Sequence, residues 1–116
     1  MSVFPGPQID LTPEEVHRRM TAGELVLVDV REPYEYEAGH VPESVHIELE
    51  RLASAAAQIP DDRPVAFLCL SGARSAMATN AFRRAGYEAY NVGGGFAAWF
   101  DADLPVEPED GEVAPH

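Results

Sequence analysis

Two runs of apolar residues constrain the fold of this chain more than any other feature. Residues 25–30 read LVLVDV and residues 65–68 read VAFL. A strand with one face in water alternates apolar and polar residues, whereas a near-continuous apolar run is typical of a strand buried on both faces. Strands of that kind belong mostly to parallel sheets. The sequence therefore predicts a parallel sheet that contains both runs.

Helical patterns alternate with these and other strand patterns. The first helix is expected over residues 12–22, because Thr12 suits the N-cap, Pro13 the first helical position and Glu15 the capping-box position, and Gly23 ends it. Further helices are expected over residues 34–38, 49–59, from the end of the second apolar run to about 85, and 96–100. Short strands are expected over residues 9–11, 45–47 and 88–92. This alternation predicts the α/β class.

Length and composition limit what the chain can be. Its 116 residues fit one domain. The formal net charge is -12, with 8 basic against 20 acidic residues, and the absence of a basic stripe argues against nucleic-acid binding. No apolar run is long enough for a membrane span, and residues 1–5 lack the pattern of a signal peptide, so we expect a cytoplasmic protein that does not bind membranes.

Three segments are expected along the chain. Residues 1–7 contain Pro5, Gly6 and Pro7 and are predicted to be a flexible lead-in. Residues 8–105 form the domain. Residues 106–116 are acidic and proline-rich, and we expect them to be disordered.

Cys69, the one cysteine of the chain, lies where the second apolar run ends and a helical pattern begins. Ligands bind at the carboxyl ends of strands in open α/β sheets, and a helix N-terminus offers unpaired N–H groups and a partial positive charge. Gly72 lets the loop curl so that successive N–H groups point inward. Such a site favours a thiolate and predicts a reactive cysteine. The alternative is a small buried apolar residue at a strand end.

Three stretches of the sequence resemble the rhodanese-like sulfurtransferase family, as a stand-alone single domain. They are residues 29–42 (DVREPYEYEAGHVP), 69–75 (CLSGARS) and 90–99 (YNVGGGFAAW), in the family's order. The resemblance covers roughly residues 8–105. It implies a three-layer fold, with a central parallel sheet of about five strands flanked by helices. We expect neither a cofactor nor a metal ion.

The resemblance also implies a reaction. A thiolate at Cys69 takes a sulfane sulfur from a donor such as thiosulfate and becomes a persulfide, from which a thiol or cyanide then removes the sulfur. The partners are therefore a small anionic donor and a thiophilic acceptor, with a sulfur-relay protein as a further possibility. The loop that would surround the persulfide consists of Leu70, Ser71, Gly72, Ala73, Arg74 and Ser75.

Supporting roles are expected for four charged or titratable side chains. Arg74 either holds the anionic end of the donor, which we favour, or braces the loop through an ion pair with an acid such as Glu32. Asp29 and Arg31 are expected to pair with each other and to fix the loop around Gly39. His40 is expected to make a hydrogen bond within that same loop.

The sequence departs from the family pattern at two places. Glu43 and Ser44 stand where the family usually has a glycine and a small residue, so the local backbone is open to difference. Leu70 and Ser71 are uncharged, whereas members that use thiosulfate often carry basic or polar side chains early in this loop. This second departure leaves the identity of the sulfur donor open.

Other functions use similar features. Cysteine-dependent phosphatases and arsenate reductases share the architecture but place their arginine one residue further from the cysteine. Here only four residues separate Cys69 from Arg74, which makes a tighter bowl suited to a single sulfur atom. A sulfur carrier or regulatory module without turnover stays open as the main alternative. A cysteine protease is disfavoured, because no histidine and orienting residue are marked for that role.

Overall fold

The computed structural model describes residues 9–116, so the lead-in predicted for residues 1–7 lies outside the described part. The fold is α/β, as predicted, with one five-stranded sheet in the order β1-β5-β4-β2-β3. All four neighbouring pairs of strands are parallel. The strands are β1 (Asp10–Leu11), β2 (Val26–Asp29), β3 (Val45–His46), β4 (Val65–Leu68) and β5 (Ala89–Val92).

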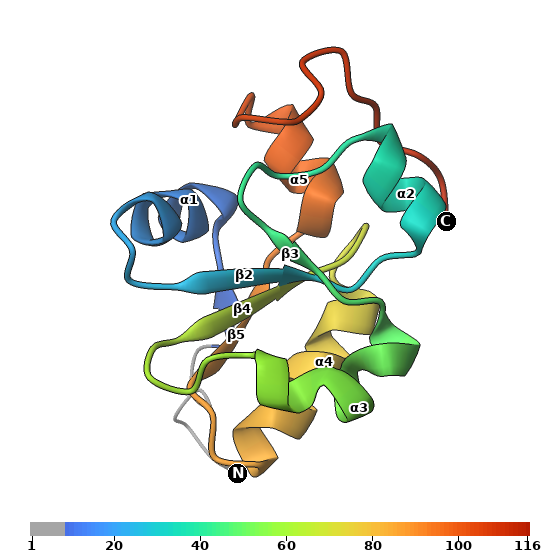
Figure 1. The fold of residues 1–116 in the computed structure, drawn as a ribbon. Helices are drawn as coiled ribbons and strands as arrows, with labels where there is room; N and C mark the ends of the chain where they lie inside the picture. The colour runs from blue at the N-terminus through green and yellow to red at the C-terminus, as the bar shows by residue number, and fades with distance from the viewer. Residues whose placement is uncertain (1–8) are drawn as a thin grey trace, which may run out of the picture.

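Helices cover both faces of the sheet (Figure 1). They are α1 (Pro13–Thr21), α2 (Pro33–Ala38), α3 (Leu52–Ala55), α4 (Ala73–Arg84) and α5 (Gly95–Asp101). Figure 1 places α3 and α4 on one face and α1 and α5 on the other, with α2 beside α5. In residues 9–116 no helix has both the length and the apolar character that crossing a bilayer requires.

The single helix predicted over residues 49–59 is instead three short pieces. The four-residue α3 lies between two 3-10 segments, Leu49–Arg51 and Ala56–Gln58. Helical spacing of Leu49, Leu52, Ala56 and Ile59 predicts the buried side; Leu52 and Ile59 are buried there, but Ala55 rather than Ala56 is the buried alanine. Tighter 3-10 turns are common at the ends of helices, and spacing alone does not separate them from α-helix.

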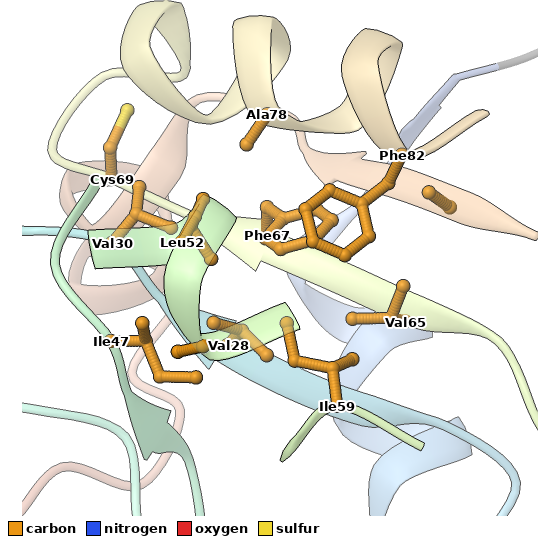
Figure 2. Close-up of a cluster of buried hydrophobic side chains, with 12 residues drawn as sticks. Val28, Val30, Ile47, Leu52, Ile59, Val65, Phe67, Cys69, Ala78 and Phe82 are labelled. Carbon is orange, nitrogen blue, oxygen red and sulfur yellow. The ribbon is translucent and has the colours of Figure 1, made fainter. Parts of the chain in front are cut away.

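The side-chain alternation along the strands builds two hydrophobic cores. Val28 and Phe67 point to the side of α3 and α4, where Phe82 joins them (Figure 2). Leu27 and Leu68 point to the other side, where they pack with residues of α1 and α5. Trp99 of α5 is fully buried there.

The capping pattern predicted for the start of α1 is confirmed in part. Thr12 Oγ1 accepts a hydrogen bond from the Glu15 backbone N–H at 3.1 Å, as an N-cap should. The Glu15 carboxylate does not complete a capping box, because it pairs with Arg18 and Arg19 at 2.8 and 2.7 Å. The two arginines lower the pKa of this partly exposed carboxyl to about 2.

Residues 41–44 form a tight turn, although Glu43 and Ser44 depart from the family pattern. The Ser44 N–H donates to the Val41 carbonyl at 3.2 Å, with Pro42 and Glu43 in the centre of the turn. Glu43 has a φ of +70°, a conformation that favours glycine. The backbone therefore adopts a glycine-type turn although a glutamate occupies the position.

The C-terminal segment runs along α2 in the structure, whereas the sequence predicts disorder for residues 106–116. His40 and Glu107 exchange two backbone hydrogen bonds of 2.9 and 2.7 Å, and the Glu112 N–H donates to the Ala38 carbonyl at 2.8 Å. A Cβ at Gly39 would lie 2.6 Å from the Glu112 carbonyl oxygen, so this glycine permits the close approach. Backbone pairing of this kind leaves no trace in composition.

Candidate functional site

Cys69 follows β4, the third of the five strands in the sheet. Its side chain lies at one end of the core beneath α4, with the sulfur directed towards that helix (Figure 2), and the residue is only 1% exposed. Gly72 precedes α4 with a φ of +108°, which confirms that the loop curls at this residue. Cys69 is thus a core residue and a loop residue at once.

Three donors surround the sulfur. The backbone N–H groups of Gly72 and Ser75 point at Sγ from 3.1 and 3.4 Å, and the Ser75 hydroxyl lies 3.3 Å away. Burial by itself raises the pKa of the Cys69 thiol, but these donors and the N–H of Ser71 outweigh burial and lower the pKa below its ordinary value. The donors around Sγ therefore favour the thiolate form of Cys69, which purely apolar surroundings would not do.

The start of α5 holds the backbone of the cysteine loop through hydrogen bonds. Phe96 N–H donates to the Cys69 carbonyl at 2.7 Å and Ala97 N–H to the Leu70 carbonyl at 3.1 Å. A Cβ at Gly95 would lie within 2.6 Å of both carbonyl oxygens. Residues 93–95 thus make a tight turn from β5 into α5, and α5 fixes two loop carbonyls so that the N–H groups that follow can turn towards the sulfur.

Arg74 forms an ion pair with Glu35. Its two terminal nitrogens contact the two carboxylate oxygens at 2.9 and 3.0 Å, and Glu35 is fully buried. Glu35 also accepts from the Glu32 N–H at 2.9 Å and lies 3.3 Å from His116 Nδ1. Burial would raise the pKa of Glu35, but hydrogen bonds from Arg74 and from the Glu32 N–H outweigh it and lower the pKa.

This pairing differs from the role favoured for Arg74 in the sequence. The structure uses the guanidinium to brace the cysteine loop against α2, and its partner is Glu35 rather than Glu32. Glu32 precedes α2, so only its backbone N–H reaches the pair, whereas Glu35 lies in the first turn of α2 with its side chain directed inward.

The predicted pair Asp29–Arg31 is present and fully buried. Arg31 Nη2 lies 2.8 Å from Asp29 Oδ2 and donates to the Gly39 carbonyl at 2.8 Å. Within residues 9–116, Arg31 Nη1 makes no hydrogen bond, and the guanidinium lies over the Phe96 ring at 4.2 Å. The pair therefore ties β2 to the loop that ends α2, as the sequence predicts.

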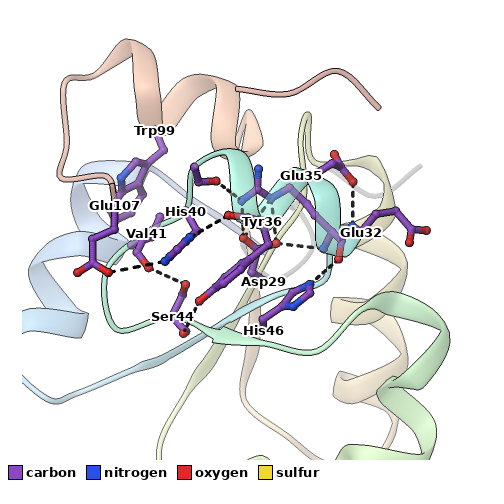
Figure 3. A network of polar contacts seen from close by, with 12 residues as sticks. Asp29, Glu32, Glu35, Tyr36, His40, Val41, Ser44, His46, Trp99 and Glu107 are labelled. Atoms are coloured by element: carbon purple, nitrogen blue, oxygen red, sulfur yellow. Dashed lines mark hydrogen bonds and ion pairs between the residues drawn. The ribbon is translucent and has the colours of Figure 1, made fainter. Parts of the chain in front are cut away.

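His40 makes its hydrogen bond within the predicted loop. Its Nδ1 donates to the Tyr36 carbonyl at 2.8 Å, and its ring stacks on Tyr36 with centroids 3.9 Å apart. Tyr36 stacks on His46 at 4.4 Å on the other side (Figure 3). These contacts are those of a residue that shapes the loop.

An acidic cluster occupies the same edge of the sheet as Cys69. Glu32 follows β2, and Glu48 and Glu50 follow β3; their carboxylate oxygens lie within 4.8 Å of one another. In the described part of the chain this is the one group whose ligand atoms are close enough to share a cation. Acidic groups at the surface are common without an ion, and we assign no metal to these three, of which Glu50 is exposed and the other two are partly buried.

Two residues of the site were missed in the sequence. Glu35 lies inside the first resembling stretch but was not singled out. Asn91 of β5 is buried and bonds to Ser75, to the Gly72 carbonyl and to Asp10. A polar residue inside a predicted short strand was the available signal for Asn91.

Known proteins resemble this chain in sequence and in fold. The family model for the rhodanese-like domain matches residues 12–102. HTH-type transcriptional regulator Rv0324 of Mycobacterium tuberculosis is 39% identical over 108 residues, which cover 90% of this chain and 47% of that protein. The chain therefore spans about half the length of this relative.

Solved structures share the fold. A rhodanese-related protein of Thermoplasma volcanium aligns with a TM-score of 0.78 at 26% identity, covering 84% of this chain and 95% of that one. A protein of unknown function from Rhodopseudomonas palustris, described as a possible tyrosine phosphatase, aligns with a TM-score of 0.75 at 29% identity, covering 86% and 85%. With its sheet order, its cysteine loop and the match over residues 12–102, this chain belongs to the rhodanese-like domain family.

Proposed function

We propose that this protein is a sulfurtransferase that carries sulfur as a persulfide on Cys69. The observation that carries the proposal is the set of donors around Sγ: the N–H groups of Gly72 and Ser75 and the Ser75 hydroxyl, all within 3.4 Å. Because these donors lower the thiol pKa, they raise the fraction of thiolate, the nucleophilic form, without a neighbouring general base.

The reaction has two displacement steps. With thiosulfate, the Cys69 thiolate attacks the outer sulfur; the sulfur–sulfur bond of the donor breaks and sulfite leaves with the electron pair. Cys69 then carries a persulfide anion. Cyanide or a thiolate attacks the outer sulfur, forms thiocyanate or a new persulfide, and the Cys69 thiolate leaves. No net oxidation occurs and no cofactor is needed.

The donor and the compartment belong to this proposal. Because Arg74 is engaged by Glu35, an anionic donor would depend on the loop N–H groups for its binding. Thiosulfate is therefore a test substrate rather than an assigned donor. We place the protein in the cytoplasm, where a lone thiol stays reduced.

A regulatory or sulfur-carrier module is the second candidate. It is favoured by one observation, the 39% identity to a transcriptional regulator of which this chain spans 47%. Such a module would accept sulfur on Cys69 without rapid release to small acceptors. Phosphatase chemistry is less well supported, because it needs an arginine free to hold an oxyanion and Arg74 is paired with Glu35.

Intact mass after exposure to thiosulfate, and separately to 3-mercaptopyruvate, tests the proposal. One added sulfur atom, removed by cyanide with release of thiocyanate over many turnovers, supports an enzyme. Added sulfur that small acceptors do not remove supports the carrier module. The Cys69→Ser protein should fold normally and gain no sulfur. A wild-type protein that gains none from either donor, or a Cys69→Ser protein that retains activity, would contradict sulfur transfer through this residue.

A further inference from the structure

The Ser75 hydroxyl lies within hydrogen-bond distance of two acceptors. Its oxygen is 3.3 Å from Cys69 Sγ and also contacts Asn91 Oδ1, and Ser75 is fully buried. A hydroxyl has one hydrogen to donate, so it cannot serve a thiolate and the Asn91 oxygen at the same time. The hydrogen must be shared between two positions.

The orientation of the Asn91 side chain makes this competition unavoidable. Its Nδ2 lies 3.0 Å from Asp10 Oδ1 and 3.3 Å from the Gly72 carbonyl oxygen, both of which only accept hydrogen bonds. The reversed amide would set its oxygen against these two acceptors. Asp10 and Gly72 therefore hold the amide so that Oδ1 faces Ser75.

Each protonation state of the sulfur then has its own hydrogen-bond pattern. In the thiol, S–H can donate to Ser75 Oγ while the hydroxyl donates to Asn91, and every group is satisfied. When the S–H proton leaves to solvent, the hydroxyl turns to the thiolate and Asn91 Oδ1 loses its donor. A buried acceptor without a donor is unfavourable, so Asn91 works against the thiolate.

We propose that Asn91, held by Asp10, is a positioning residue that controls the Ser75 hydroxyl and so limits how strongly Cys69 is ionised. The inference deepens the proposed function, on which its catalytic meaning rests. A thiolate loses nucleophilicity as the pKa of its thiol falls, so a limit on ionisation keeps the sulfur reactive. Charged groups that face this site are Arg74 of α4, whose charge interacts with Cys69, Glu35 of α2, which pairs with Arg74, and Asp10 of β1, which contacts Asn91.

The test is the pKa of the Cys69 thiol, measured from the pH dependence of its alkylation rate and of thiolate absorbance. The Ser75→Ala variant loses a donor to the thiolate, and its thiol pKa should rise. Asn91→Leu, of similar volume, frees the hydroxyl for the sulfur and should lower the thiol pKa by roughly 0.5–1, the equivalent of one ordinary hydrogen bond. Because Asn91 acts through Ser75, the Asn91→Leu substitution should leave the pKa unchanged in the Ser75→Ala background.

The decisive comparison is the effect of Asn91→Leu on the thiol pKa in the wild-type protein and in the Ser75→Ala variant. A pKa that Asn91→Leu leaves unchanged or raises overturns the proposal. So does an equal fall with and without the Ser75 hydroxyl, which would mean that the loop itself has been distorted. If Asn91→Leu does not fold, Asp10→Ala on the edge strand β1 replaces it. A smaller fall in the thiol pKa that occurs only when Ser75 is present supports the proposal, and any other result overturns it. No sulfur donor is present, so this result is independent of whether the protein transfers sulfur.

Discussion

At Cys69, burial and hydrogen bonding act on one sulfur in opposite directions. Burial in the core favours the neutral thiol, whereas the loop donors favour the anion, and the donors prevail to lower the pKa. The pKa is therefore lower in the folded chain than in the unfolded one. Stability gained from the thiolate is present above the pKa of the unfolded thiol and is lost as the pH falls through the pKa of the folded one.

We therefore expect the alkylation rate of wild-type Cys69 to rise through an inflection below the free-thiol value of about 8.5. The rate is measured by quenching the reaction of the thiol with iodoacetamide at successive times and determining the alkylated fraction by mass spectrometry at each pH. The same measurement on the protein unfolded in urea gives the reference value for the thiol pKa. An inflection at or above the unfolded value would mean that burial prevails and that the thiolate is not preformed.

The Arg74–Glu35 pair leads to a prediction about binding and turnover. Lysine cannot replace a bidentate guanidinium, so Arg74→Lys should destabilise the fold by about 2 kcal/mol and reduce turnover, with little change in the Michaelis constant for thiosulfate. Glu35→Gln should have a similar effect, and the two losses should be less than additive when combined. Melting temperatures and steady-state kinetics of the three variants measure this. If Arg74→Lys has a normal melting temperature and a raised Michaelis constant for thiosulfate, Arg74 binds the donor rather than bracing the loop.

The sequence was sufficient for the residues that are contiguous with Cys69. Gly72 and Ser75 lie within the same loop, so their place around the sulfur followed from the motif. Glu35 and Asn91 reach the loop from α2 and β5, and their contribution depends on how those elements pack. Arg74 was assigned to a substrate for the same reason: its charge is visible in the sequence, but the buried partner that neutralises it is not.

Among the elements, strands and helices were predicted with small errors at their ends, because burial on both faces leaves a clear pattern in β2 and β4. The region 49–59 was less well predicted, because α-helix and 3-10 turns share similar spacing. At the turn over residues 41–44 the sequence allowed a different backbone, whereas the structure keeps the glycine conformation at Glu43.

The strain at Glu43 can be removed by substitution. Glu43→Gly should stabilise the protein by about 0.5–1 kcal/mol, since the positive φ costs a non-glycine residue more than glycine loses in entropy. Glu43→Ala is the matched control, because it removes the same exposed side chain but keeps the strain. Urea denaturation compares them. Equal stabilisation by alanine would show that the side chain, and not the backbone, is responsible.

At the scale of the molecule, the sheet order brings two different features to one edge. The order β1-β5-β4-β2-β3 places the end of β4, with Cys69, beside the end of β2, and β3 follows next. The acidic cluster of Glu32, Glu48 and Glu50 therefore lies on the edge at which a donor would arrive in the proposed reaction. Topology rather than local sequence creates this proximity, since the cluster and Cys69 come from three separate strand ends.

If Cys69 forms a persulfide as proposed, the acidic cluster should make the rate of its formation depend on ionic strength. A dianion such as thiosulfate is repelled on its approach, and added salt weakens that repulsion because the Debye length is about 10 Å at 0.1 M. The second-order rate constant with thiosulfate should therefore rise with potassium chloride, while that with an uncharged persulfide donor stays flat. Changing the three glutamates to glutamine should remove most of the rise. Matched neutralisation of Glu24, Asp61 and Asp62, which precede β2 and β4 at the opposite edge, should preserve it; a rise lost equally in both triple variants would assign the repulsion to net charge alone.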